Sequence, residues 1–325
     1  MLSFFKSRVK SLLVMYSIFK EVMIDASRYY RWSATRHSLL GLNENQLLAK
    51  ITAHYHVLEK GLSMPEFRLG FGQAMVVGLK TLIVRYNEVS GDTDSTQYRA
   101  AIAVLKEYYC VHQKADFNID AYFSQSFYEK YCQSGAGRAK HFSGNYFGNN
   151  CEFKGFFQSR CSVRELLPDA LDKSLFEEAV EVASKTPSVC NRQSFGVIAV
   201  NDYDKCQQIL EHHNGNRGFG QLIGNLLIVT CDLEGFAGTT ERYQSYIDGG
   251  AFAMSLMLTL HSMEVGCCPL NWSVNNATDR ALKKRFGIPD SKNVIMLLAA
   301  GRVPEEFSVP FSKRKDASEL LEFLS

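Results

Sequence analysis

Several features that mark common classes of protein are missing from this chain of 325 residues. No apolar run reaches the roughly 18 residues that a membrane-spanning helix needs. No Cys-x-x-Cys pair occurs, and the nine cysteines are an odd number scattered along the chain. A disulfide scaffold is therefore not indicated, and reduced thiols in a cytoplasmic protein are the simpler interpretation.

An excess of charge is missing as well. Lys and Arg number 36 and Asp and Glu number 34, which gives a net charge of +2. So balanced a chain is not expected to bind nucleic acid through a broad basic surface. Apolar residues make up 46% and charged residues 22% of the chain. These fractions are ordinary for a globular protein and exclude disorder over most of its length.

The motifs of several enzyme classes are also absent. No phosphate-binding loop, Gly-x-Ser-x-Gly elbow or His-Glu-x-x-His arrangement occurs. The glycines of residues 218–224 have the wrong spacing for a dinucleotide loop and precede a predicted strand. The histidines show no ligand spacing, so no metal site is expected. Cys267 or Cys268 with His261 is a weak alternative as a nucleophilic pair, and a buried thiol in a strand is favoured.

Proline is rare in the first half of the chain. Residues 1–150 hold only Pro65, whereas the remaining 175 residues hold six prolines. Few helix breakers and apolar residues at a helical period predict a mostly helical N-terminal domain, in which Asn43 caps the second helix. The length of the chain also favours two domains. The predicted helices cover residues 7–30, 44–60, 69–89 and 95–112.

The start of the first helix has an unusual composition. Basic residues up to Lys10 precede an apolar run at residues 12–19, as in a signal peptide. Lys20 ends the run and no small-residue cleavage site follows, so the segment is interpreted as part of an amphipathic helix. A weak contact of residues 5–20 with a membrane surface is the alternative to packing on the protein.

A stretch rich in glycine, serine and asparagine predicts a linker at about residues 133–150. After it, helical and strand-like patterns alternate, so residues 151–325 are expected to form an α+β domain with a core of its own. Helices are predicted at residues 168–185, 203–213, 242–264 and 278–286. Strands are predicted at residues 195–200, 225–231, 267–274 and 293–300.

Arg160, Ser162 and Arg164 form the first motif that carries chemistry. In an extended segment, residues i, i+2 and i+4 share one face, so two guanidinium groups and a hydroxyl would converge. Such a set suits a phosphate and a neighbouring polyol. Taken alone, the motif is equally consistent with a charged turn.

A second motif is the turn Pro-Ser-Val-Cys-Asn-Arg-Gln at residues 187–193, between a predicted helix and a predicted strand. The side-chain amides of Asn191 and Gln193 both donate and accept hydrogen bonds, which suits the edge of a heteroaromatic ring. Two further elements follow in the chain. They are Pro269-Leu270-Asn271, after a helix rich in small residues, and Lys313-Arg314.

In this order and spacing, the four elements resemble the nitroreductase family of FMN-dependent oxidoreductases, over about residues 155–315. The resemblance implies an antiparallel-rich sheet flanked by helices and a homodimer with FMN at its interface. It also implies hydride transfer from NAD(P)H to a small organic acceptor. The long helical N-terminal region is similar to that of nitroreductase-like proteins encoded among surface-polysaccharide genes.

The resemblance implies a role for each matching residue. The Arg-x-Ser-x-Arg segment would hold the phosphate and ribityl chain of FMN, and Lys313 or Arg314 would complete the phosphate site. The turn at residues 187–193 would approach the flavin ring from the partner subunit. The backbone N–H of Asn271 would lie near N5 of the ring, and no catalytic residue beyond the flavin is needed. The implied cofactor-binding residues are Arg160, Ser162, Arg164, Pro187, Ser188, Asn191, Gln193, Pro269, Leu270, Asn271, Lys313 and Arg314.

Two departures from the family pattern bear on the substrate. Ser194 follows Gln193 where the family usually has proline, and Asn271-Trp272 stand where many members have Glu-Gly or Gly-Gly. Trp272 would narrow the space over the ring or stack on a substrate, which argues against a broad nitroaromatic range. Two alternatives stay open. One is a flavin-binding protein with non-redox or flavin-modifying chemistry, and the other is an interaction protein that keeps the fold without the cofactor.

Overall fold

The computed structural model describes residues 2–35, 39–62, 68–90, 92–132, 151–307, 309 and 317–324. The predicted linker at residues 133–150 and the basic pair Lys313-Arg314 lie outside this part of the chain. Within it, no helix is both long enough and apolar enough to cross a membrane.

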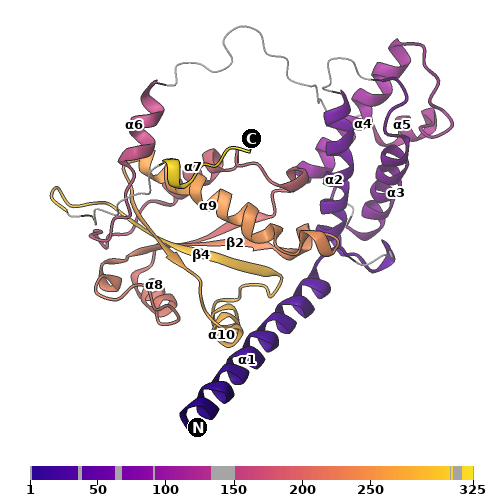
Figure 1. Ribbon diagram of the computed structural model, residues 1–325. Coiled ribbons are helices and arrows are strands. Elements are labelled where there is room, and N and C mark those ends of the chain that lie inside the picture. The colour runs from indigo at the N-terminus through magenta and orange to yellow at the C-terminus, as the bar shows by residue number, and fades with distance from the viewer. Residues whose placement is uncertain are drawn as a thin grey trace.

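The described residues of the N-terminal region form helices and turns (Figure 1). The four predicted helices are confirmed with somewhat shifted ends, and a short fifth helix was not predicted. Helices α2 to α5 form a bundle, and α1 runs away from it as a long separate rod. The helices are α1 (Leu2–Trp32), α2 (Glu44–Leu62), α3 (Gln73–Val89), α4 (Thr96–Lys114) and α5 (Gln125–Tyr131).

One apolar core holds the bundle together. Asn43 caps α2 as predicted, because its side-chain oxygen accepts a hydrogen bond from the backbone N–H of Gln46 at 2.9 Å. The Gln46 side chain in turn accepts from the backbone N–H of Asn43 at 3.1 Å, which completes a capping box. The fully buried side chains of the core include Leu47, Ile51, Leu58, Leu79, Ile83, Leu105, Tyr108 and Phe123.

The C-terminal region is built on a four-stranded antiparallel sheet in the order β1-β2-β4-β3. All four strands were predicted from their apolar runs. The central strands β2 and β4 are buried almost throughout, as expected for strands covered on both faces. The strands are β1 (Phe195–Val200), β2 (Asn225–Asp232), β3 (Gly266–Asn271) and β4 (Lys292–Gly301).

Helices cover both faces of this sheet (Figure 1). One face packs on α7 and α9 through Phe176 and Leu256, and the other packs on α8 and α10 through Ile209 and Leu282. The expected α+β fold, with a helical region before it, is therefore confirmed. The helices are α6 (Cys151–Ser159), α7 (Lys173–Ala183), α8 (Tyr203–Leu210), α9 (Gln244–Ser262) and α10 (Asn276–Phe286).

The helix predicted from residue 168 begins later, at Lys173. The preceding segment is irregular because its backbone is bonded to the sheet instead of to itself. The N–H of Leu167 donates to the carbonyl of Arg302 at 2.8 Å, and the N–H of Leu171 donates to the side chain of Asn225 at 2.9 Å.

The two regions meet at the corner formed by residues 232–236. The N–H of Ala34 donates to the carbonyl of Phe236 at 2.7 Å. The buried carboxylate of Glu234 accepts from the side-chain amides of Asn43 and Asn45 at 2.6 and 2.7 Å. A buried carboxylate that bonds two amides of the first turn of a helix fixes the position of that helix. The start of α2 is therefore held against the end of β2.

Candidate functional site

The Arg-x-Ser-x-Arg segment lies along the open edge of the sheet. The N–H of Val163 donates to the carbonyl of Cys267 at 3.0 Å, and within the described part of the chain β3 pairs with no further strand on this side. The N–H and C=O of one residue point to the same side of an antiparallel strand. The backbone N–H and C=O of Cys267 therefore point away from β4, and the same holds for the backbone groups of Pro269 and Asn271. Proline suits such a position because it lacks an N–H. The N–H of Asn271 therefore points to the open edge.

Arg160 lines a cavity of about 330 Å³ together with His261 and Cys267. The Nη1 atom of Arg160 is buried, and it has no hydrogen-bond partner among the described residues. A buried charged donor without an acceptor is costly, so such an atom marks a place where an anion would be stabilised. Arg164 is exposed, with its guanidinium 5.8 Å from the ring centre of Phe219. The cavity is not lined by Ser162 or Arg164, so the convergence of the three side chains on one phosphate stays a prediction.

The thiol alternative does not fit these surroundings. Burial raises the pKa of Cys267 to about 12 and also raises the pKa of Cys268. The positive charge of Arg160 lowers both pKa values, but by less than burial raises them. Both thiols are therefore protonated near neutral pH and poor nucleophiles. His261 bonds elsewhere, since its Nε2 lies 2.8 Å from the hydroxyl of Ser159. Burial, followed by the charge of Arg160, lowers the pKa of His261.

The turn at residues 187–193 has an unusual backbone. Cys190, Asn191 and Gln193 have φ angles of 49°, 53° and 51°, a region that non-glycine residues rarely adopt. Each such residue costs on the order of 1–3 kcal/mol and persists only where its surroundings hold it. Here the hydroxyl of Ser188 accepts from the N–H of Gln193 at 2.9 Å, and the Gln193 amide donates to the Asn191 carbonyl at 3.1 Å.

Contacts outside the turn add to this restraint. Arg192 is almost fully buried and forms an ion pair with Glu241 at 2.7 Å. The N–H of Val189 donates to the carboxylate of Asp248 at 3.2 Å. Strain at a turn that also carries two half-buried side-chain amides is typical of a functional site.

Helix α2 packs directly behind the turn. Tyr55 of α2 donates a side-chain hydrogen bond to Gln97, and burial raises the pKa of Tyr55 to about 12, with a smaller lowering by the nearby Asn191 side chain. A cavity of about 290 Å³ lies beside this contact, lined by α2, by Gln97 and by residues 192–196. The N-terminal region therefore contacts the turn itself, a placement that no local sequence signal indicates.

The predicted site has two parts, the segment around Arg160 and the turn at residues 187–193, and these lie far apart in one chain. The turn precedes β1 at one edge of the sheet, and Arg160 lies beside β3 at the other edge, three strand spacings or about 14 Å away. The register aligns Val200 with Cys268 across the sheet, whereas the turn adjoins Phe195, about 17 Å further along. The two parts thus occupy diagonally opposite corners, about 20 Å apart.

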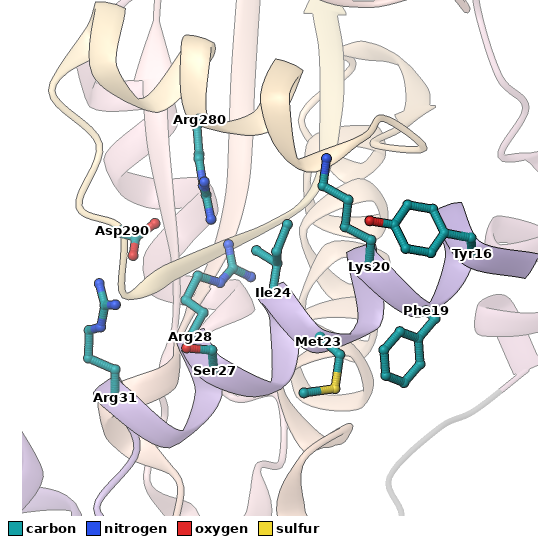
Figure 2. A pocket seen from close by; sticks show the side chains of 10 residues that line it. All are labelled: Tyr16, Phe19, Lys20, Met23, Ile24, Ser27, Arg28, Arg31, Arg280 and Asp290. Carbon is teal, nitrogen blue, oxygen red and sulfur yellow. The ribbon is translucent and has the colours of Figure 1, made fainter. Parts of the chain in front are cut away.

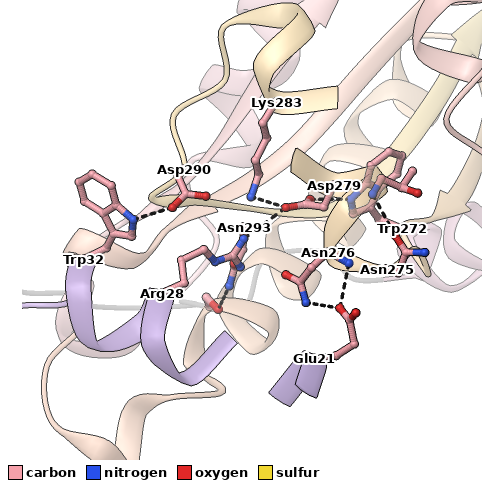
Figure 3. Close-up of polar contacts among 12 residues, drawn as sticks. Glu21, Arg28, Trp32, Trp272, Asn275, Asn276, Asp279, Lys283, Asp290 and Asn293 are labelled. Atoms are coloured by element: carbon pink, nitrogen blue, oxygen red, sulfur yellow. Dashed lines mark hydrogen bonds and ion pairs between the residues drawn. The ribbon is translucent and has the colours of Figure 1, made fainter. Parts of the chain in front are cut away.

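The end of β3 involves a residue that the sequence did not reveal. The Nε2 atom of His213 bonds to the carbonyl of Asn271 at 2.7 Å, and the His213 ring faces Trp272 with centres 6.4 Å apart. The side chain of Asn271 donates to Ser273 at 3.0 Å, while Leu270 is buried. The indole of Trp272 donates to Asp279 at 2.9 Å, so this side chain is engaged with α10 (Figure 3). Among the described residues, no three His, Cys, Asp or Glu side chains gather as a metal site requires.

One known family resembles the second region of the chain. Residues 157–216 and 225–302 match the model of the Nitroreductase family. This part of the chain is therefore similar to the nitroreductase family, and the match supports an oxidoreductase.

Similar solved structures have low sequence identity to the chain. A Bacillus subtilis protein designated a nitroreductase is 19% identical, over 54% of this chain and 100% of its own, with a TM-score of 0.47. An FMN-dependent nitroreductase from Clostridium difficile R20291 is 17% identical, over 53% and 99%, with a TM-score of 0.45. A Desulfovibrio desulfuricans nitroreductase in complex with FMN is 18% identical, over 56% and 99%, with a TM-score of 0.46. The search of curated proteins found no match.

Proposed function

We propose that the protein is an FMN-dependent oxidoreductase that takes hydride from NAD(P)H and passes it to a small organic acceptor. The observation that carries the proposal is the buried Nη1 of Arg160 beside β3, which has no hydrogen-bond partner among the described residues. It belongs to the motif that holds the FMN phosphate in the resemblance described above. The match to the Nitroreductase family supports the same chemistry.

The residues along β3 would each contribute a contact. Arg160, Ser162 and Arg164 would bind the phosphate and the ribityl chain, and the pair Lys313-Arg314 would complete the phosphate site. The outward N–H of Asn271 would donate to N5 of the ring, and Pro269 and Leu270 would line it. Bound FMN would supply the hydride and electron transfer itself, while the protein orients and tunes the ring.

The turn at residues 187–193 would come from a second copy of the chain. One chain places this turn about 20 Å from Arg160, so a complete site needs a partner subunit. In a homodimer, Pro187, Ser188 and Asn191 would approach the ring held by the other subunit, with Gln193 behind them. The exposed Tyr243 and Ile247 at the start of α9 offer apolar area for such an interface.

The N-terminal region would then influence the flavin pocket. We propose that residues 1–150 form a separate helical domain, joined by a linker at about residues 133–150 to the reductase domain of residues 151–325. Because α2 packs against residues 189–191 of the turn, this domain would hold the turn in its strained shape and limit which acceptors enter. Eight of the nine cysteines are free thiols, which favours a cytoplasmic location.

Anaerobic reduction of the FMN-loaded protein tests the proposed activity. Adding NADH or NADPH is expected to bleach the visible flavin band. Asn271→Pro removes the N–H that would bond N5, and it keeps the fold because this N–H points away from β4, as at Pro269. Reduction should slow by about tenfold, the loss expected for one hydrogen bond of roughly 1.4 kcal/mol.

Asn271→Ala is the matched control, because it keeps the backbone donor and should reduce at the rate of the unchanged protein. A flavin band that persists with both nicotinamides would contradict the proposal and favour non-redox flavin chemistry. If the protein binds no FMN, the alternative of an interaction protein that keeps the fold without the cofactor is favoured. If the alanine and proline variants were slowed equally, the N–H of Asn271 would have no part in the reduction.

A further inference from the structure

Helix α1 contacts the rest of the protein through its polar side. Glu21 accepts from the backbone N–H of Asn276 at 3.0 Å, Arg28 donates to Asp279 at 3.3 Å, and Trp32 donates to Asp290 (Figure 3). At 100° per residue, positions 21, 28 and 32 fall within about 40° of one another. This side of α1 therefore faces α10 and the loop after it.

The opposite side of α1 is apolar and uncovered. Leu12, Phe19, Met23 and Tyr30 lie about 180° from Glu21 around the helix. Their exposed fractions are between 51% and 65%, and Tyr16 beside them is 67% exposed. A surface helix normally turns its apolar side to the core and its polar side to water. In α1 this orientation is reversed, which marks the apolar stripe as a binding surface.

Positive charge accompanies the stripe. The first 20 residues carry Lys6, Arg8, Lys10 and Lys20 and no acidic residue. A groove of about 410 Å³ between α1 and α10 adds Arg31 and Arg280 at the flank of the stripe, with Asp290 as its one acidic lining residue (Figure 2). Arg28 also lines this groove, but Asp279 neutralises it.

We propose that α1 lies flat on an anionic phospholipid surface. The apolar stripe would enter the boundary of the acyl chains, and Lys20, Arg31 and Arg280 would meet the lipid phosphates. Charge complementarity favours lipid over a second copy of the chain, because two copies would bring like-charged N-terminal segments together. The helix would bind at the interface, since no described helix can span a bilayer. This inference is independent of the proposed redox activity.

Co-sedimentation of the full chain with lipid vesicles tests the inference. The protein should sediment with vesicles of phosphatidylcholine mixed with phosphatidylglycerol, bind pure phosphatidylcholine at least tenfold more weakly, and dissociate at high salt. Leu12→Asp together with Phe19→Asp should weaken binding at least tenfold, because two large apolar side chains are lost from the contact. Arg31→Gln and Arg280→Gln should each weaken it about fivefold.

Val182→Asp is the matched control, because Val182 of α7 is equally exposed at 55% but lies outside the stripe. This variant should sediment like the unchanged protein. Absence of binding to the mixed vesicles would overturn the inference, and so would salt-insensitive binding or unchanged binding by the stripe variants. If the stripe variants instead reduce the mass of the assembly in ultracentrifugation and no vesicles bind, the stripe is an interface between two copies.

Discussion

Replacing Arg160 by alanine is expected to weaken FMN binding by roughly 10- to 100-fold. A hydrogen bond to a charged group contributes about 1.5–3 kcal/mol, and each 1.4 kcal/mol is a factor of ten in affinity. Stability without FMN should stay equal or rise slightly, because the substitution also removes a buried donor that lacks an acceptor. Titration of the flavin-free protein with FMN, followed by flavin fluorescence, measures the first effect, and urea unfolding measures the second.

Two further variants make the interpretation specific. Arg160→Lys keeps the charge but loses the forked donor geometry, so its FMN affinity should fall between those of the unchanged protein and the alanine variant. Arg99→Ala removes an exposed guanidinium from α4 and should change neither property. If the Arg160→Ala protein bound FMN normally, Arg160 would not be part of the phosphate site. One that unfolds would assign Arg160 a structural role.

Asp279→Ala is expected to destabilise the protein by about 3–5 kcal/mol, because it leaves two cations without their shared carboxylate. The side chains of Arg28, Asp279 and Lys283 are only 10%, 12% and 4% exposed. Asp279 forms ion pairs with Arg28 at 3.3 Å and with Lys283 at 2.7 Å, and it accepts a hydrogen bond from the indole of Trp272 (Figure 3). Burial already lowers the pKa of Lys283 although Asp279 opposes this shift. Chemical denaturation with urea measures the loss.

A second substitution checks the cause of that loss. Lys283→Met in the Asp279→Ala protein removes one of the two unpaired cations and should restore part of the stability. Glu178→Ala on α7 removes an exposed carboxylate and should change the free energy of unfolding by less than about 0.5 kcal/mol. A cost below about 1 kcal/mol for Asp279→Ala would show that the buried ion cluster does not hold α1 and α10 together.

The elements of the fold were predictable where the signal is local. Apolar runs located all four strands, and Asn43 marked the start of α2 because an N-cap contact spans only a few residues. The start of α7 was wrong by five residues, since bonds from Leu167 and Leu171 to the distant sheet hold the chain extended there. Strand order follows from long-range pairing, for which the chain offers no local pattern.

The sequence singles out the motifs of the candidate site but does not indicate where they lie in the fold. The motifs around Arg160 and Asn191 stand out because particular side chains recur at short spacing. Their separation to opposite corners of the sheet depends on the strand order. The contact of His213 with Asn271 and the ion pair of Arg28 with Asp279 join residues 58 and 251 positions apart, so no spacing signals them.

Native mass spectrometry of the protein saturated with FMN tests the central claim most directly, because it reports chains and flavins in one particle. A site shared between two copies predicts particles of two chains with two FMN molecules. Arg160→Ala should reduce the flavin content of these particles without dissociating them. Single chains that retain FMN, or dimers that stay free of flavin at saturation, would contradict the account.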